Sequence, residues 1–97
     1  MTVGVCRIRL RLAENHSLKG KRQVVKSIVS QVSNRFNVSV AEVEDQDLWQ
    51  IATIAVACVS NDASVVNEVM SRVVNFISQG RWDVELLDYE TELLPVS

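Results

Sequence analysis

A group of cations at the start of a helix is the feature of this sequence most able to do chemistry. Ser17 is suited to cap a helix, and Lys19, Lys21 and Arg22 follow it in the first turn. The macrodipole disfavours a cation there by about 0.3–1 kcal/mol. Exposed helix amides and these side chains, with Lys26 one turn further on, would together hold a phosphate or a carboxylate.

Acidic residues elsewhere in the chain offer a second explanation for these cations. Helical spacing puts Lys21 near the middle of the apolar face, so it must reach the rim of the sheet or meet an acid. We expect four acids at the same end of the sheet, namely Glu42, Glu44, Asp45 and Asp47. Structural neutralisation and ligand binding both stay open at this point.

His16 is the single histidine of the chain, and it lies beside this helix start. It could act as a general acid or base with Glu42, Asp45 or Asp47 as its carboxylate partner. A lone histidine at such a position is more often a capping or surface residue, so we expect no catalysis. Cys6 and Cys58 lie far apart in apolar runs and form no zinc or CxxC motif, and we expect buried, reduced thiols. No motif predicts a metal or a cofactor.

The charge of the chain is divided unevenly along its length. Residues 1–36 hold eight Lys/Arg and one acid, for +7, whereas residues 37–97 hold two Lys/Arg and eleven acids, for −9. The sum is the formal charge of −2. Such asymmetry can mark a nucleic-acid surface, and it can equally mean that the two halves neutralise each other in the fold.

Length and hydropathy set the broad class of the protein. The 97 residues suit one domain spanning 1–97. No apolar run approaches the roughly 18 residues of a membrane span, and the first residues lack the pattern of a signal peptide. We therefore expect a cytoplasmic protein that does not enter a membrane.

Hydrophobic periodicity predicts the elements that position these residues. They are a strand at 3–12, a helix of four to five turns from Leu18, strands at 37–43 and 49–60, a helix capped by Asn61 or Asp62 and followed by Gly80, and a strand at 82–94. The order βαββαβ predicts an α+β, ferredoxin-like split βαβ fold. We expect a four-stranded antiparallel sheet of order 4-1-3-2 with two helices on one face.

This strand order would place two charged rows side by side. They are Arg7, Arg9 and Arg11 on the first strand and Asp88, Glu90 and Glu92 on the last. Opposite charges across a strand pair contribute about 0.2–1 kcal/mol each. We favour this internal charge ladder over an arginine stripe that binds RNA or phosphate.

The strand at 49–60 is apolar on both of its faces. One row holds Trp49, Ile51, Ala55, Ala57 and Val59, and the other holds Ala52, Ile54, Val56 and Cys58. One row must lie on the face that has no helices, where an apolar strip indicates an interface. We expect a homodimer with Trp49 and Ile51 at the contact, unless arginine stems cover a narrow strip.

Five segments together carry a family resemblance. They are residues 16–22 (HSLKGKR), 36–43 (FNVSVAEV), 46–50 (QDLWQ), 59–62 (VSND) and 86–90 (LLDYE). Over nearly its whole length the chain resembles the YlxP-like bacterial proteins, a family of unknown function. The resemblance implies a ferredoxin-like fold and genes often found near a translation initiation factor and ribosome-binding factor A. It implies no catalytic residues.

One position departs from the family pattern. The family usually has an acid three residues after the serine, which completes a capping box, and this chain has Gly20. The helix start is therefore weaker and more positive than is usual in the family.

These observations favour a non-catalytic cytoplasmic module that binds RNA or a ribosome-associated protein through the basic face of the first helix. The alternative is a structural or regulatory homodimer that associates through the strand at 49–60 and has no role with nucleic acid. The open sheet face lacks the paired aromatic residues on which an RRM-like sheet stacks bases.

Overall fold

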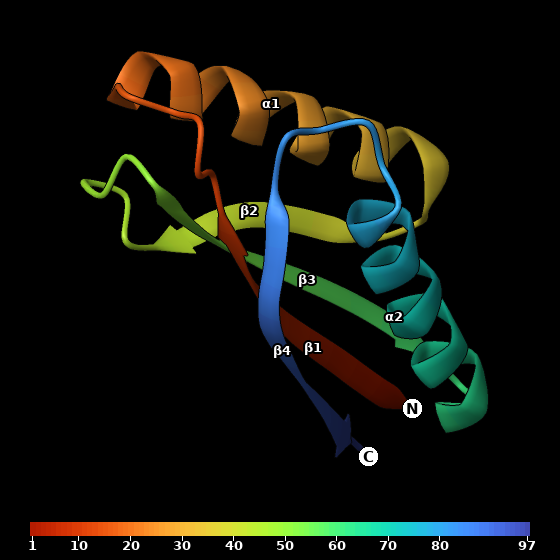
Figure 1. Ribbon diagram of the computed structural model, residues 1–97. Helices are drawn as coiled ribbons and strands as arrows, with labels where there is room; N and C mark the ends of the chain where they lie inside the picture. The colour runs from red at the N-terminus through yellow and green to blue at the C-terminus, as the bar shows by residue number, and fades with distance from the viewer.

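The strands and helices follow the order expected from the sequence. The computed structural model describes residues 1–97. Its elements are β1 (Thr2–Arg11), α1 (Leu18–Arg35), β2 (Ser39–Glu44), β3 (Ile51–Ser60), α2 (Ala63–Ser78) and β4 (Glu85–Pro95) (Figure 1). The four strands form one antiparallel sheet of order β2-β3-β1-β4. This is the predicted order 4-1-3-2 read from the other edge.

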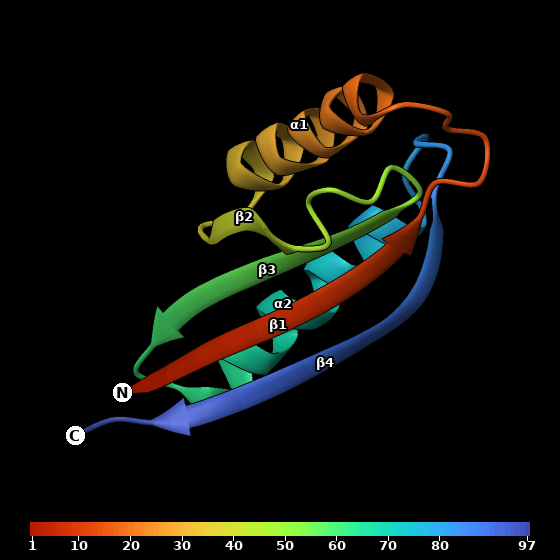
Figure 2. The same cartoon turned by 90° about the vertical axis from the view of Figure 1, so that its left-hand side faces the viewer.

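Alternation along β1 sets the position of the core. Cys6, Ile8 and Leu10 are fully buried, whereas the residues between them lie on the other face of the sheet. Buried residues of α1 and of α2 join this same row in one cluster, so both helices pack on one face of β1. Figure 2 shows α2 crossing behind the strands while α1 lies towards the β2 edge.

The predicted charge ladder between β1 and β4 is confirmed only in part, since Arg7 lies opposite Glu90 but pairs with Glu44 of β2. Arg9 pairs with Asp88 at 2.8 Å, and Arg11 pairs with Glu85 at 3.6 Å. The register shifts between Arg9 and Leu10, which moves Glu85 into the place that a regular strand would give to residue 86. Glu92 lies opposite Val5 rather than opposite an arginine, so its predicted role in the ladder is wrong.

The two apolar rows of β3 lie on opposite faces of the sheet as expected, except at the start of the strand. Ala52, Ile54 and Val56 are buried against the helices, and Ala55 and Ala57 lie opposite Arg7 and Val5 on the open face. Strand β3 begins at Ile51, so the assignment of Trp49 to its open row is wrong. Trp49 lies in the β2–β3 connection.

Each helix is capped at its N-terminus by a residue that the sequence predicted. Ser17 accepts a hydrogen bond from the amide of Gly20, and Asp62, not Asn61, accepts one from the amide of Ser64. Hydrogen bonds from the Ser64 hydroxyl and amide lower the pKa of Asp62. Gly80 follows the end of α2 as expected, and its amide donates to the carbonyl oxygen of Ile77, although its φ is not positive. Neither helix combines the length and the apolar composition required to cross a membrane.

Candidate functional site

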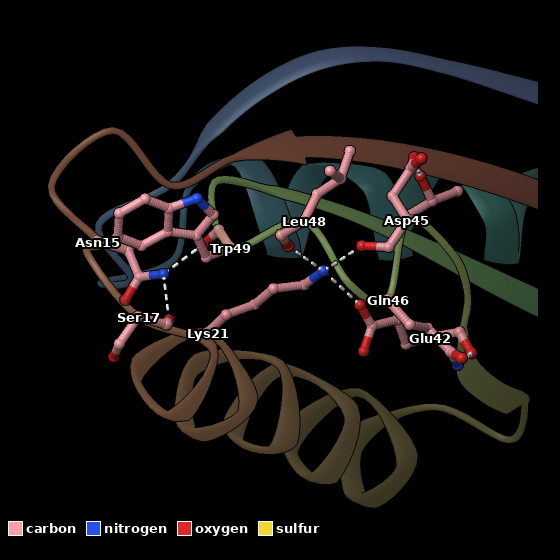
Figure 3. Close-up of polar contacts among 9 residues, drawn as sticks. Asn15, Ser17, Lys21, Glu42, Asp45, Gln46, Leu48 and Trp49 are labelled. Carbon is pink, nitrogen blue, oxygen red and sulfur yellow. Dashed lines mark hydrogen bonds and ion pairs between the residues drawn. The ribbon is translucent and has the colours of Figure 1, made fainter.

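Lys21 lies at the centre of the contacts between α1 and the β2–β3 connection. Its side chain is 1% exposed, and its Nζ is 2.8 Å from Glu42 Oε2. The same Nζ donates to the carbonyl oxygens of Asp45 at 2.5 Å and Leu48 at 2.6 Å (Figure 3). The ammonium group therefore makes two hydrogen bonds and one ion pair within the protein. Because its side chain is buried and paired, Lys21 is not accessible to an external ligand.

The β2–β3 connection is shaped around this ammonium group. Asp45 has a φ of 58°, in the left-handed region that residues other than glycine seldom occupy. Its carbonyl oxygen accepts from Lys21 and from the amide of Leu48. Its carboxylate accepts from the Thr53 hydroxyl at 3.0 Å. The lysine on α1, the turn and β3 are thus held by one residue.

The acids of this hairpin do not act as one cluster. Glu42 lies on the helix side of β2, where it meets Lys21, and Glu44 pairs with Arg7 on the open face at 3.4 Å. A shift of register between Glu42 and Glu44 places these two carboxylates on opposite faces. Asp47 is exposed and makes no ion pair. Neutralisation is therefore shown for Lys21 by Glu42 alone.

Asn15 closes the other side of the same helix start. Its Nδ2 donates to the carbonyl oxygen of Ser17 at 2.7 Å and to that of Trp49 (Figure 3). A Cβ on residue 20 would overlap Asn15 Oδ1. Gly20 thus leaves room for the amide side chain of Asn15 beside the helix start.

Gly20→Ala tests this explanation. Alanine in a helix is favoured over glycine by about 1 kcal/mol, so an unobstructed site would gain stability. We expect Gly20→Ala to lower the free energy of unfolding in urea, because the methyl group displaces Asn15 from its two carbonyl partners. In an Asn15→Ala background the same substitution should become neutral or stabilising. A stabilising Gly20→Ala in the otherwise unchanged chain would contradict the explanation.

The remaining cations of α1 form an exposed stripe. Lys19, Arg22 and Lys26 are all exposed, and none of them makes an ion pair. The helix from Leu18 to Arg35 contains no acid. Arg7, Arg9, Arg11, Lys21 and Arg72 are by contrast paired with carboxylates. The uncompensated positive charge of the chain is therefore concentrated on α1.

His16 packs against Trp49 instead of against an acid. The two ring centroids are 6.3 Å apart in an edge arrangement. No carboxylate forms an ion pair or hydrogen bond with His16, and the Glu42 carboxylate considered as its partner is bound to Lys21. The structure does not bring the catalytic pair together. No three His, Cys, Asp or Glu side chains gather in a way that could hold a metal ion.

Both thiols are less acidic than an ordinary cysteine. Desolvation by burial raises the pKa of Cys6, with a smaller opposing contribution from the Thr91 hydroxyl. Cys58 is half-buried instead of buried as expected, and this partial burial also raises its pKa. Both groups are free thiols, and at neutral pH they are protonated and poor nucleophiles.

Sequence reasoning missed two parts of this region. The carbonyl oxygens of Asp45 and Leu48 have no signal in residue types, because any residue supplies a carbonyl. Asn15 carried a weak signal, since a short polar side chain before a capping serine is suited to bond nearby backbone.

The geometry defines a small α+β protein in which a basic helix is fixed to a β-hairpin by a buried lysine. A family model described as "Protein of unknown function (DUF503)" matches residues 3–91. The chain belongs to the DUF503 family, which confirms the resemblance found in its sequence.

One curated relative and one solved structure add to this assignment. The chain is 43% identical over 61 residues to "Uncharacterized protein YlxP" of Bacillus subtilis (strain 168), an alignment that covers 63% of this chain and 66% of that protein. The de novo designed protein Foldit4 matches over 100% of both chains with a TM-score of 0.54 and 14% identity. At that identity the likeness shows the fold alone.

Proposed function

We propose that this protein is a non-catalytic cytoplasmic module of ferredoxin-like architecture that binds RNA phosphates through Lys19, Arg22 and Lys26. The observation that carries the proposal is the free stripe on α1, in a chain whose net charge is −2. A cation that lacks an internal partner is available to a phosphate, and such contacts bind without reading sequence. The translation-linked setting implied by the family resemblance supports RNA as the polyanion.

The burial of Lys21 makes this proposal narrower than the one drawn from the sequence. Lys21 contributes rigidity instead of charge, because it fixes the first turn of α1 to the hairpin. The amide of Gly20 is occupied by Ser17 Oγ. Binding is therefore assigned to the exposed side chains of the stripe and not to the amides of the helix start.

The test is the affinity of a labelled RNA hairpin, measured by fluorescence anisotropy between about 50 and 200 mM salt. Lys19→Gln with Arg22→Gln should weaken binding at least about tenfold and flatten the salt dependence. Asn67→Glu with Ser71→Glu on α2 is the matched control, because it changes the net charge by the same amount at exposed positions. An equal loss of RNA affinity in both double variants would show that net charge alone determines binding, and it would contradict the proposal.

A second candidate function is homodimerisation through the open sheet face. The apolar residues there form a strip that no helix covers: Val5, Ala41, Ala55, Ala57 and Val59. Val59 is 61% exposed, and Val5 and the residues of β2 and β3 border an apolar hollow of about 220 Å³. A strip of this kind favours association with a second copy.

Light scattering at micromolar concentration checks this second candidate. We expect a dimer that Ala57→Glu converts to a monomer, because the carboxylate would be placed in the middle of the strip. Trp49→Ala serves as the control, since Trp49 lies outside the strip. A monomeric unaltered protein would remove the dimer from consideration.

A further inference from the structure

The C-terminal ends of α1 and α2 meet at an aromatic cluster that the proposed RNA-binding stripe does not use. The ring of Phe76 lies 5.7 Å from that of Phe36 and 5.6 Å from that of Trp82, both in edge arrangements. The guanidinium of Arg35 lies over Phe76, 4.9 Å from the ring centroid. Three of the five aromatic residues in the chain are gathered at this point.

Two open hollows lie on either side of Phe76. One has a volume of about 480 Å³ and is lined by Ser27, Gln31, Phe76, Gly80, Arg81 and Trp82. The other has a volume of about 530 Å³ and is lined by Arg35, Phe36, Arg72, Asn75, Phe76 and Gln79. Both volumes fall in the range of about 300–1,000 Å³ common to ligand sites. We refer to them as the Trp82 hollow and the Phe36 hollow.

The charge of the two hollows is of one sign. Their linings include three arginines and no acid, in a chain that has twelve acids. Arg72 pairs with Glu68 along α2, and Arg35 stacks on Phe76. Arg81 makes no ion pair and no side-chain hydrogen bond. An anionic ligand would therefore find at least one guanidinium free of any internal partner.

The ring of Trp82 is held in a fixed orientation at the edge of its hollow. Its Nε1 donates to Ser27 Oγ at 3.1 Å, and Gln31 Nε2, one turn further along α1, donates to the same oxygen at 3.1 Å. A Cβ on residue 80 would overlap the ring, so Gly80 lets the indole lie directly against the backbone. A half-buried aromatic ring fixed from three sides is a ready surface for stacking.

We infer that these two hollows bind unpaired nucleotides of single-stranded RNA, with bases against Trp82 and Phe76 and phosphates on Arg35, Arg72 and Arg81. Bases stack on aromatic rings and on guanidinium planes, and single-stranded RNA is recognised mainly in this way. The amides of Gln31, Asn75 and Gln79 offer donors and acceptors for base edges. An acidic peptide would use the arginines but not the aromatic rings, so the combination favours RNA.

This inference deepens the proposed function and rests on it in naming RNA as the ligand. On α1, Ser27, Gln31 and Arg35 recur every four residues and border α2, whereas Lys19, Arg22 and Lys26 lie on the other flank of the exposed arc. The stripe and the hollows are therefore separate surfaces of one helix. Their contributions can be measured independently.

The experiment compares a short single-stranded RNA with an RNA hairpin, both labelled, by fluorescence anisotropy. Arg35→Gln with Arg81→Gln, and separately Phe76→Leu, should weaken the single strand at least about fivefold and leave the hairpin unchanged. Arg7→Gln with Arg11→Gln on the open sheet face is the charge-matched control. In a Trp49→Phe protein, Trp82 is the single tryptophan, and its fluorescence should be quenched by the single strand.

The outcomes separate the two proposals. Unchanged single-strand affinity in the Arg35/Arg81 and Phe76 variants overturns this inference, and the stripe stands if Lys19→Gln with Arg22→Gln still weakens both RNAs. If the Arg35/Arg81 variant loses single-strand binding while Lys19→Gln with Arg22→Gln binds both RNAs unchanged, the hollows are supported and binding by the stripe is excluded. Quenching of Trp82 by poly-glutamate as strong as by RNA at equal salt overturns the inference in favour of an acidic protein.

Discussion

Lys21→Met is expected to lower the free energy of unfolding by about 3–5 kcal/mol, the range for breaking a buried ion pair from one side. The substitution leaves the Glu42 carboxylate, whose side chain is 16% exposed, without its counter-ion. It also leaves the carbonyl oxygen of Leu48 without a donor, whereas that of Asp45 keeps the hydrogen bond from the Leu48 amide. Urea denaturation followed by circular dichroism measures the effect.

Lys19→Met is the matched control for this prediction. It removes the same charge from the same turn of α1, but at an exposed position without an ion pair. A surface change of this kind stays within about 0.5 kcal/mol. Equal stability of the two variants would show that the buried lysine does not hold α1 to the hairpin.

A double variant separates the ion pair from the carbonyl contacts. Glu42→Gln in the Lys21→Met background removes the uncompensated charge but does not restore a donor to the carbonyl oxygen of Leu48. We expect it to recover part of the lost stability and not all of it, since an unpaired buried polar group costs about 1–3 kcal/mol. Full recovery would assign the whole effect to the Glu42 carboxylate.

Periodicity was sufficient for the fold because the buried rows here are long and regular. Cys6, Ile8 and Leu10 alternate with arginines on β1, and that pattern predicts a half-buried strand. The order of elements then restricts the topology to very few sheets. The strand order, the caps at Ser17 and Asp62 and the pairing of Arg9 with Asp88 follow from these signals.

The parts that the sequence did not predict depend on single-residue shifts. Glu42 and Glu44 are two residues apart and should share a face, but the register shift at residue 43 separates them. A second shift in β4 moves Glu85 opposite Arg11 and leaves Glu92 outside the ladder. Such bulges depend on how strands fit together in space, and local pattern does not encode them.

The candidate site was predicted in composition but not in geometry. The sequence placed Lys21 near the apolar arc of α1 and four acids near it, and one of these four, Glu42, is its partner. It could not show that backbone carbonyls complete the environment of the ammonium group. The aromatic hollows were missed because Phe76 and Trp82 are separated by the end of α2 and come together only through the turn at Gly80.

Gly4→Ala is expected to destabilise the protein by about 1–3 kcal/mol through overpacking of the core. Gly4 is buried within β1, where an added Cβ would overlap Val66 Cγ1 and lie 3.2 Å from Met70 Cε. A strand glycine normally gives up about 0.5–1 kcal/mol relative to alanine, so the usual effect has the opposite sign. We expect the clash to dominate because Val66 is fully buried on α2.

Thermal unfolding resolves this effect, because about 1 kcal/mol shifts the melting temperature of a domain this size by about 4–8 °C. Val66→Ala alone should also destabilise, since it opens a cavity between α2 and β1. In Gly4→Ala with Val66→Ala the new methyl group enters that cavity, so the combined loss should be smaller than the sum by about 0.5–3 kcal/mol. Strictly additive losses would mean that Gly4 does not set the distance between α2 and the sheet.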